Sequence, residues 1–133
     1  MKILHISNFV QKHDGRLYWN HCFKINNGFI RNGHNVLSFS DRDIVRQDLI
    51  NKINNNKTLN ERLIRTFKNF LPDVVVLGHA EKIYNSTLAE FKLINKDVKI
   101  IEWCVDNYYL DNTENKFKKR SDHIDAFFIT NAD

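Results

Sequence analysis

Proline, glycine and cysteine are scarce in this chain of 133 residues, which holds one proline, four glycines and two cysteines. Cys22 and Cys104 fit no metal-binding or redox spacing, so we expect both to be small buried hydrophobic residues. No apolar run approaches the roughly 20 residues that span a membrane. The apolar start of the chain is too short for a secretory signal peptide. Together with the length, these absences predict one cytoplasmic domain.

The positive charge lies in the amino-terminal half of the chain. Residues 1–57 hold nine Lys and Arg against four Asp and Glu, whereas the remainder holds eleven against twelve. A basic half of this kind could make a peripheral contact with an anionic membrane surface, or bind a phosphorylated ligand. The alternative is a solvated face in a chain rich in Lys and Asn. The basic residues are not interleaved with aromatic residues, so we expect no nucleic-acid partner.

Five short apolar runs predict the strands of a sheet. Residues 73–77 form a β-branched run without polar alternation, which is typical of a strand buried on both faces in a parallel sheet. Pro72 ends the segment before it. We expect this central strand to lie beside the first strand, with the second strand on the first strand's other side. The remaining runs are residues 2–7, 35–40, 98–105 and 126–130.

Helical periodicity separates most of these strands. Apolar residues from Leu17 to Ile30 fall on one stripe, which Gly33 ends. Residues 108–119 predict a polar connection with about one helical turn. Two further helices are predicted to open with capping boxes, formed by Thr58 with Glu61 and by Thr87 with Glu90. Strands alternating with helices at this pitch predict an α/β fold with a doubly wound, mostly parallel, Rossmann-like sheet in three layers.

Polar residues follow the strands at the expected carboxyl edge of the sheet. Ligands of open α/β sheets bind outside this edge, near the point where strand order reverses. Ser7 and Asn8 follow the first strand, and the next loop carries His13 and Arg16, whose guanidinium could pair with phosphate. That loop offers only Gly15, so it is not the G-x-G-x-x-G fingerprint of dinucleotide-binding proteins.

The end of the central strand carries the strongest candidate for a functional site. Gly78 would let a backbone approach a ligand closely. His79 is the strongest candidate for a ligand contact, with a simple loop cap as the alternative. Glu81 is a weaker candidate for a catalytic base. Asp41, at the end of the second strand, could contact an acceptor or form a local ion pair.

Asp106 follows the fourth apolar run. Its carboxylate could act as a base, because Trp103 and Tyr108 would desolvate it. His5, inside the first strand, is predicted to be a core residue. The other histidines are too scattered for a metal site, so no metal is expected: His21, His34 and His123.

Four segments carry a resemblance to a known family. They are KILHISN at 2–8, NNGFIRNGHNV at 26–36, LPDVVVLGH at 71–79 and IEWCVDN at 101–107. In this combination they resemble the amino-terminal, Rossmann-like half of GT-B glycosyltransferases. The similarity is greatest to the spore-maturation-type branch, in which a Trp and an Asp likewise follow an apolar strand.

The resemblance implies a two-domain enzyme that transfers a sugar from a nucleotide-sugar donor to a glycosyl acceptor. Such enzymes generally need no metal held by an Asp-x-Asp motif, and no cofactor is expected. Residues 1–133 would be the acceptor-side domain, and the carboxyl-terminal donor-binding domain is absent from this chain, so we expect no activity from it alone. His79 and Asp106 would be catalytic. The substrate contacts would be Ser7, Asn8, His13, Arg16, Asp41, Gly78 and Glu81.

A stand-alone flavodoxin-like or receiver-like binding domain without enzymatic activity is the alternative. A receiver would need clustered acidic residues after the first strand and a phosphorylatable Asp after the third. A flavodoxin would need a phosphate loop rich in Ser, Thr and Gly after the first strand. The chain has Ser7 and Asn8 at that place, which argues against both.

Overall fold

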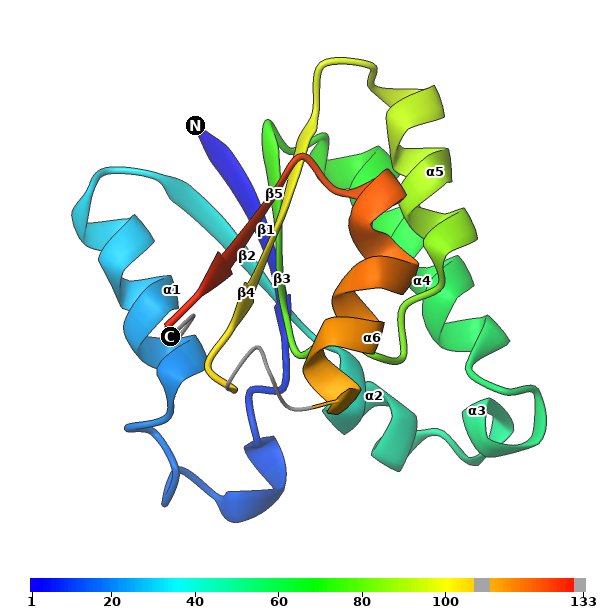
Figure 1. Cartoon of the computed structure of the whole chain (residues 1–133). Coiled ribbons are helices and arrows are strands. Elements are labelled where there is room, and N and C mark those ends of the chain that lie inside the picture. Colours follow the sequence, from blue (N-terminus) through cyan, green and yellow to red (C-terminus); the bar gives the residue numbers. More distant parts are fainter. Residues whose placement is uncertain (107–110, 131–133) are drawn as a thin grey trace.

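Five parallel strands form one sheet in the order β2-β1-β3-β4-β5 (Figure 1). The strands are β1 (Lys2–Ser7), β2 (Asn35–Ser40), β3 (Val74–Gly78), β4 (Lys99–Cys104) and β5 (Ala126–Ile129). The expected neighbours of the first strand are confirmed. Strand order reverses between β1 and β3, as in the flavodoxin-like class of doubly wound sheets. This computed structural model describes residues 1–106 and 111–130.

Helices cover both faces of the sheet, which makes the predicted Rossmann-like three-layer fold (Figure 1). One face carries α1 (His21–Arg31), and the opposite face carries α4 (Lys57–Phe70), α5 (Asn85–Ile94) and α6 (Asp111–Arg120). The connection from β2 to α4 runs through two short helices below the carboxyl edge, α2 (Asp41–Gln47) and α3 (Leu49–Ile53). Two 3-10 turns complete the described chain, η1 (Gln11–His13) and η2 (Ser121–His123).

The main apolar core lies between the sheet and the helices α4 and α5. Phe67 of α4 and Phe91 of α5 are fully buried, and their rings stack 4.2 Å apart at 6°. Val75 and Val76 of β3 are almost fully buried, as expected of a strand covered on both faces. Val74, at the start of the strand, is only partly buried, which corrects that part of the prediction.

Several boundaries differ from those predicted. The segment expected to be a polar connection forms the ten-residue helix α6, apart from residues 108–110, which lie outside the described part. Its apolar contact comes from one ring, because Phe117 packs 4.8 Å from Phe127 of β5. A single aromatic residue among polar ones gives too weak a hydrophobic periodicity to predict a helix. Helix α1 begins four residues later than expected, and Leu17 is exposed.

Both predicted capping boxes are wrong. Helix α4 begins one residue before Thr58, whose hydroxyl accepts a hydrogen bond from the side chain of Asn54 at 2.6 Å. Thr87 lies inside α5 and donates to Asn60 Oδ1 at 2.8 Å. The capping pattern misled because these side chains make tertiary hydrogen bonds in place of local ones.

None of the helices in the described ranges has the length and apolar character needed to cross a membrane.

Candidate functional site

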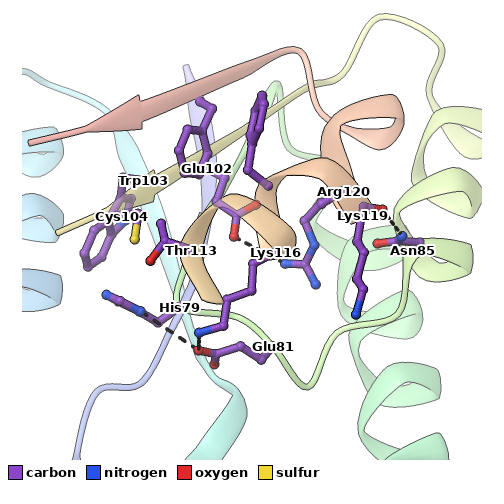
Figure 2. A pocket seen from close by; sticks show the side chains of 12 residues that line it. His79, Glu81, Asn85, Glu102, Trp103, Cys104, Thr113, Lys116, Lys119 and Arg120 are labelled. Carbon is purple, nitrogen blue, oxygen red and sulfur yellow. Dashed lines mark hydrogen bonds and ion pairs between the residues drawn. The ribbon is translucent and has the colours of Figure 1, made fainter. Parts of the chain in front are cut away.

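Two pockets open at the carboxyl edge of the sheet, and His79 and Trp103 line both. The first pocket, of about 240 Å³, lies between the end of β4 and helix α6 (Figure 2). The second, of about 260 Å³, lies at the switch point between β1 and β3, where doubly wound sheets bind their ligands. The switch-point pocket is lined by Ser7, Asn8, Asn20, His21, Arg42, His79, Trp103 and Val105.

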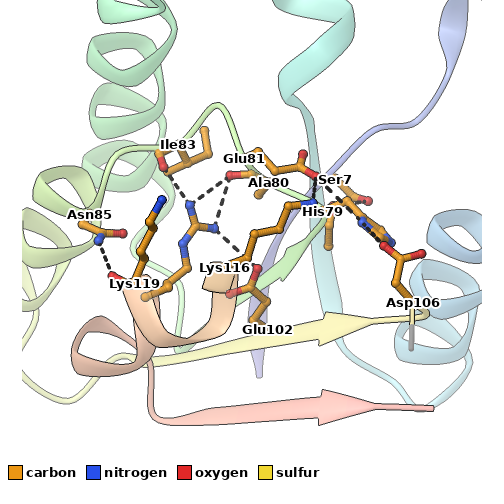
Figure 3. A network of polar contacts seen from close by, with 12 residues as sticks. Ser7, His79, Ala80, Glu81, Ile83, Asn85, Glu102, Asp106, Lys116 and Lys119 are labelled. Carbon is orange, nitrogen blue, oxygen red and sulfur yellow. Dashed lines mark hydrogen bonds and ion pairs between the residues drawn. The ribbon is translucent and has the colours of Figure 1, made fainter. Parts of the chain in front are cut away.

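His79 follows β3 in a left-handed backbone conformation, with φ of 51°. This conformation costs free energy for a residue with a Cβ and is enriched at functional sites. The imidazole meets the indole of Trp103 edge-on, with ring centroids 5.7 Å apart. Its Nδ1 lies 3.8 Å from Asp106 Oδ2 and 4.0 Å from Glu81 Oε1 (Figure 3). The side chain is 26% exposed, so His79 is held in place yet accessible.

Glu81 connects the loop after β3 to two helices. Its carboxylate accepts a hydrogen bond from Arg42 of α2 at 2.7 Å and pairs with Lys116 of α6 at 3.3 Å (Figure 3). Burial is the largest single influence and would raise the pKa of Glu81, but the hydrogen bonds to its carboxylate and the charges of Arg42 and Lys116 together bring the pKa below its ordinary value. A lowered pKa and two ion pairs make the Glu81 carboxylate a weak proton acceptor, which argues against the predicted role as a catalytic base.

Arg120 and Glu102 form a second polar group beneath α6. Arg120 donates to the carbonyl oxygens of Ala80 and Ile83 and lies 3.5 Å from the carboxylate of Glu102. Burial raises the pKa of Glu102, and the charge of Arg120 opposes that shift. Sequence reasoning missed both residues, although a glutamate inside the apolar run at 98–105 was a usable signal for a buried partner.

Asn60 of α4 anchors the loop that carries His79 and Glu81. Its side-chain nitrogen donates to the carbonyl oxygens of Asn56 and Lys82, and its oxygen accepts from the backbone of Tyr84. With the hydroxyl of Thr87 included, Asn60 makes four hydrogen bonds while almost fully buried. A buried amide whose donors and acceptor are all hydrogen-bonded holds the neighbouring loop in one conformation. The sequence contained no local sign of this role.

The lack of a side chain at Gly78 makes room for Trp103 and not for a ligand. A Cβ at this position would lie 2.2 Å from Cζ2 of Trp103, so the indole occupies the space expected for a ligand. Ser7, in register with Gly78, donates its hydroxyl to the Gly78 carbonyl at 3.0 Å. A glycine is therefore needed at position 78 to make room for the indole. Ser7 lines the switch-point pocket, but its hydroxyl proton is already used in the hydrogen bond to Gly78.

Asp41 is fully buried and lines neither of these pockets, so it does not present a carboxylate to an acceptor there as predicted. Its Oδ1 accepts from the backbone of Arg42, and its Oδ2 has no hydrogen-bond partner among the described residues. Burial raises the pKa of Asp41 to about 6. Its neighbour Asp43 accepts from Ser40 and from the backbone of Gln11, which ties the loop after β1 to α2.

His13 and Arg16 lie in the loop between β1 and α1, away from both pockets. The Arg16 guanidinium is exposed and lies 3.3 Å from Nδ1 of His13. The structure does not bring this pair to the residues of the switch-point pocket. Asn8 from the same loop does line that pocket, as expected.

The tryptophan that separates the pockets is oriented by His5. Trp103 Nε1 donates to His5 Nε2 at 3.4 Å, and His5 Nδ1 lies 3.1 Å from Asn26 Oδ1. This network requires a neutral imidazole with its proton on Nδ1. His5 is fully buried, and burial lowers its pKa to about 4. The expectation of a core residue is therefore confirmed, but His5 also acts on the site through Trp103.

The two cysteines lie in different environments. Cys22 is buried as expected, and burial raises the pKa of its thiol to about 11. Cys104 is only partly buried, lines the pocket beneath α6 and lies near His79, so the expectation of a buried hydrophobic residue is wrong for it. Asp106 lies within the described chain, whereas Tyr108, expected to desolvate it, does not.

Fold and site together define a Rossmann-like α/β domain with a ligand-sized pocket at its topological switch point. No protein-family model matches this sequence, and no significant match to a curated protein is found.

Proposed function

We propose that this chain is the acceptor-side domain of a GT-B-type glycosyltransferase, and that the switch-point pocket binds a sugar. The observation that carries the proposal is the convergence of Asn8, His79 and Trp103 at the reversal between β1 and β3. A sugar presents hydroxyl groups that match amides and imidazoles, and an apolar ring face that matches an indole. A pocket with aromatic walls and a few convergent polar groups suits such a ligand.

His79 and Asp106 have distinct roles in this proposal. His79 lies against the donor sugar, while Asp106 is the carboxylate available to take a proton from an acceptor hydroxyl. Their side chains lie 3.8 Å apart, so an acceptor oxygen bound beside His79 would be within reach of Asp106. Arg42 is already paired with Glu81, so the diphosphate is assigned to a second domain and not to this pocket.

Catalysis would then require that second domain. It would supply the donors for the leaving diphosphate, a place where preorganised electrostatic stabilisation contributes most. Losing one such donor costs on the order of 100-fold in rate, so this chain by itself should bind sugars without transferring them.

Tryptophan fluorescence tests the proposal directly. The chain has two tryptophans, and Trp19 is exposed, so a Trp19→Phe variant reports on Trp103 alone. We expect nucleotide sugars, mono- or disaccharides to shift its emission at millimolar concentration or below. His79→Ala should weaken the response at least about tenfold. His123→Ala, a histidine outside both pockets, is the matched control.

Two results would overturn the proposal. One is the absence of a Trp103 response to every sugar and nucleotide sugar in the panel. The other is release of nucleoside diphosphate above the buffer rate that disappears in His79→Ala, because this half would then hold a complete active site.

The strand order favours a second candidate, a stand-alone flavodoxin-like binding domain. Flavodoxins hold a phosphate at the loop after β1, where this chain has Asn8 and a single glycine, Gly15. Titration of flavin mononucleotide in the same panel separates the two functions. Quenching of flavin fluorescence without any response to sugars would select this second candidate.

A further inference from the structure

Three metal-binding groups of different chemistry converge at the carboxyl edge of the sheet. They are a ring nitrogen of His79, the sulfur of Cys104 and a carboxylate oxygen of Asp106, all within 4.8 Å of one another. His79 Nδ1 and Asp106 Oδ2 are 3.8 Å apart (Figure 3). Cys104 lies beside the imidazole at the mouth of the pocket beneath α6 (Figure 2).

The spacing is close to that of a tetrahedral metal site. Bonds of about 2.0 to 2.3 Å from zinc to nitrogen, oxygen and sulfur place neighbouring ligand atoms roughly 3.3 to 3.7 Å apart. The observed separations therefore need to shorten by about 1.5 Å at most. Rotation of side chains can supply this, because the carboxylate of Asp106 is 46% exposed and Cys104 is only partly buried. His79 is restrained by Trp103 and provides the fixed ligand.

The same three residue types could form a nucleophilic triad, but the arrangement argues against it. A catalytic triad places the nucleophile on one imidazole nitrogen and the carboxylate on the other. Here the sulfur and the carboxylate lie near the same nitrogen of His79, so the three donors surround a common point. Convergence on one point is the arrangement of metal ligands.

Glu81 is the nearest further carboxylate, 4.0 Å from His79 Nδ1. It already carries ion pairs with Arg42 and Lys116 and is not among the three converging donors. A thiolate and one free carboxylate together bring two negative charges, which balance the charge of a divalent ion. Thiolate excludes magnesium and calcium, which prefer oxygen ligands, and the mixed donor set suits zinc.

We propose that His79, Cys104 and Asp106 bind one Zn²⁺ ion. Three protein ligands leave a fourth position open, as in catalytic zinc sites. Because His79 lines both pockets, that position would be accessible to a water molecule or a ligand oxygen from either of them. The zinc site shares His79 and Asp106 with the proposed sugar site, but it can be tested separately, because its test uses the metal alone and no sugar.

Cobalt substitution tests the proposal on the whole chain. We expect Co²⁺ added to the chelator-treated protein to bind with one-to-one stoichiometry. Binding should give a thiolate-to-cobalt charge-transfer band and the visible bands of four-coordinate cobalt. Zinc should displace the cobalt and raise the melting temperature of the protein. His79→Ala should weaken cobalt binding at least about tenfold.

Substitution of each proposed ligand should change cobalt binding or the cobalt spectrum in its own way. Cys104→Ser changes one atom and should abolish the charge-transfer band, whereas Asp106→Asn should weaken binding and keep the band. Cys22→Ala removes the other thiol and should leave the spectrum unchanged, as should His123→Ala. Circular dichroism and melting of every variant without metal establish that each one folds.

Two outcomes would overturn the zinc site. The first is a wild-type protein that shows no charge-transfer band and no stabilisation with millimolar metal. The second is a band that persists in folded Cys104→Ser and disappears in Cys22→Ala. A failure of sugar binding would leave the metal titrations unaffected, so the two proposals can fail separately.

Discussion

The two faces of the sheet are built from different chemistry. The face beneath α4 and α5 is apolar and closed, with Phe67 and Phe91 fully buried. The face beneath α1 holds the fully buried His5 and the partly buried Trp103 in a hydrogen-bonded network. Farther along this second face, toward β5, Phe128 is 58% exposed. The comparison indicates that one face supplies most of the stability, while the other holds the residues that shape the site.

The largest expected effect tests the apolar face. Phe67→Ala removes a stacked, fully buried ring and should lower the free energy of unfolding by about 3 to 5 kcal/mol. Phe128→Ala on the opposite face is the matched control and should change it by about 0.5 kcal/mol or less. Urea denaturation measures both. Equal losses would mean that the second face is covered in solution, and the contrast between the faces would be wrong.

The second test uses pH, because protonation of His5 and of Asp41 should change the free energy of unfolding in opposite directions. His5 has a folded pKa of about 4 against an ordinary 6.5, so its contribution to stability is present above pH 6.5 and is lost as pH falls toward 4. Asp41 has a folded pKa of about 6 against 3.8, so its buried charge costs stability above pH 6, and that cost disappears as pH falls toward 3.8. Each contribution is on the order of 3 kcal/mol, and the two should nearly cancel.

Two variants separate these contributions. Relative to wild type, Asp41→Asn should lose stability as the pH falls from 6.5 to 4, because only His5 then resists protonation. His5→Gln should gain stability over the same interval, because only Asp41 then takes up a proton on folding. Chemical denaturation at several pH values gives the two difference profiles. Profiles parallel to that of wild type would show that neither group is perturbed by the fold.

The smallest expected effect concerns the contact between Gly78 and Trp103. Gly78→Ala places a methyl group 2.2 Å from the indole, so the ring must move, and the free energy of unfolding should fall by about 1 to 3 kcal/mol. Gly28→Ala, inside α1, adds a carbon that meets no described atom within 4 Å beyond its own stretch of helix, and should instead raise it by roughly 0.5 to 1 kcal/mol. Denaturation measures stability, and near-ultraviolet circular dichroism follows the indole. A neutral Gly78→Ala would mean that Trp103 does not pack on β3 in solution.

The sequence alone determined the framework. The β-branched run at 73–77 predicted a strand buried on both faces, and the alternation of strands with helices predicted a doubly wound parallel sheet. Both predictions hold because they depend on patterns within one segment, where apolar side chains fall on faces set by backbone geometry. The same logic correctly assigned His5 to the core, since it lies in such a strand.

Only the tertiary structure decided which side chains meet at the edge. Arg42 pairs with Glu81, which lies 39 residues away, and not with the neighbouring aspartates. Trp103 fills the space above Gly78, and Cys104 lies beside His79, because β3 and β4 pair in parallel with Gly78 opposite Trp103. That register depends on how the apolar faces of neighbouring strands align beneath the connecting helices, which no single segment of the sequence shows. The residues that close the site therefore come together only when the whole sheet has formed.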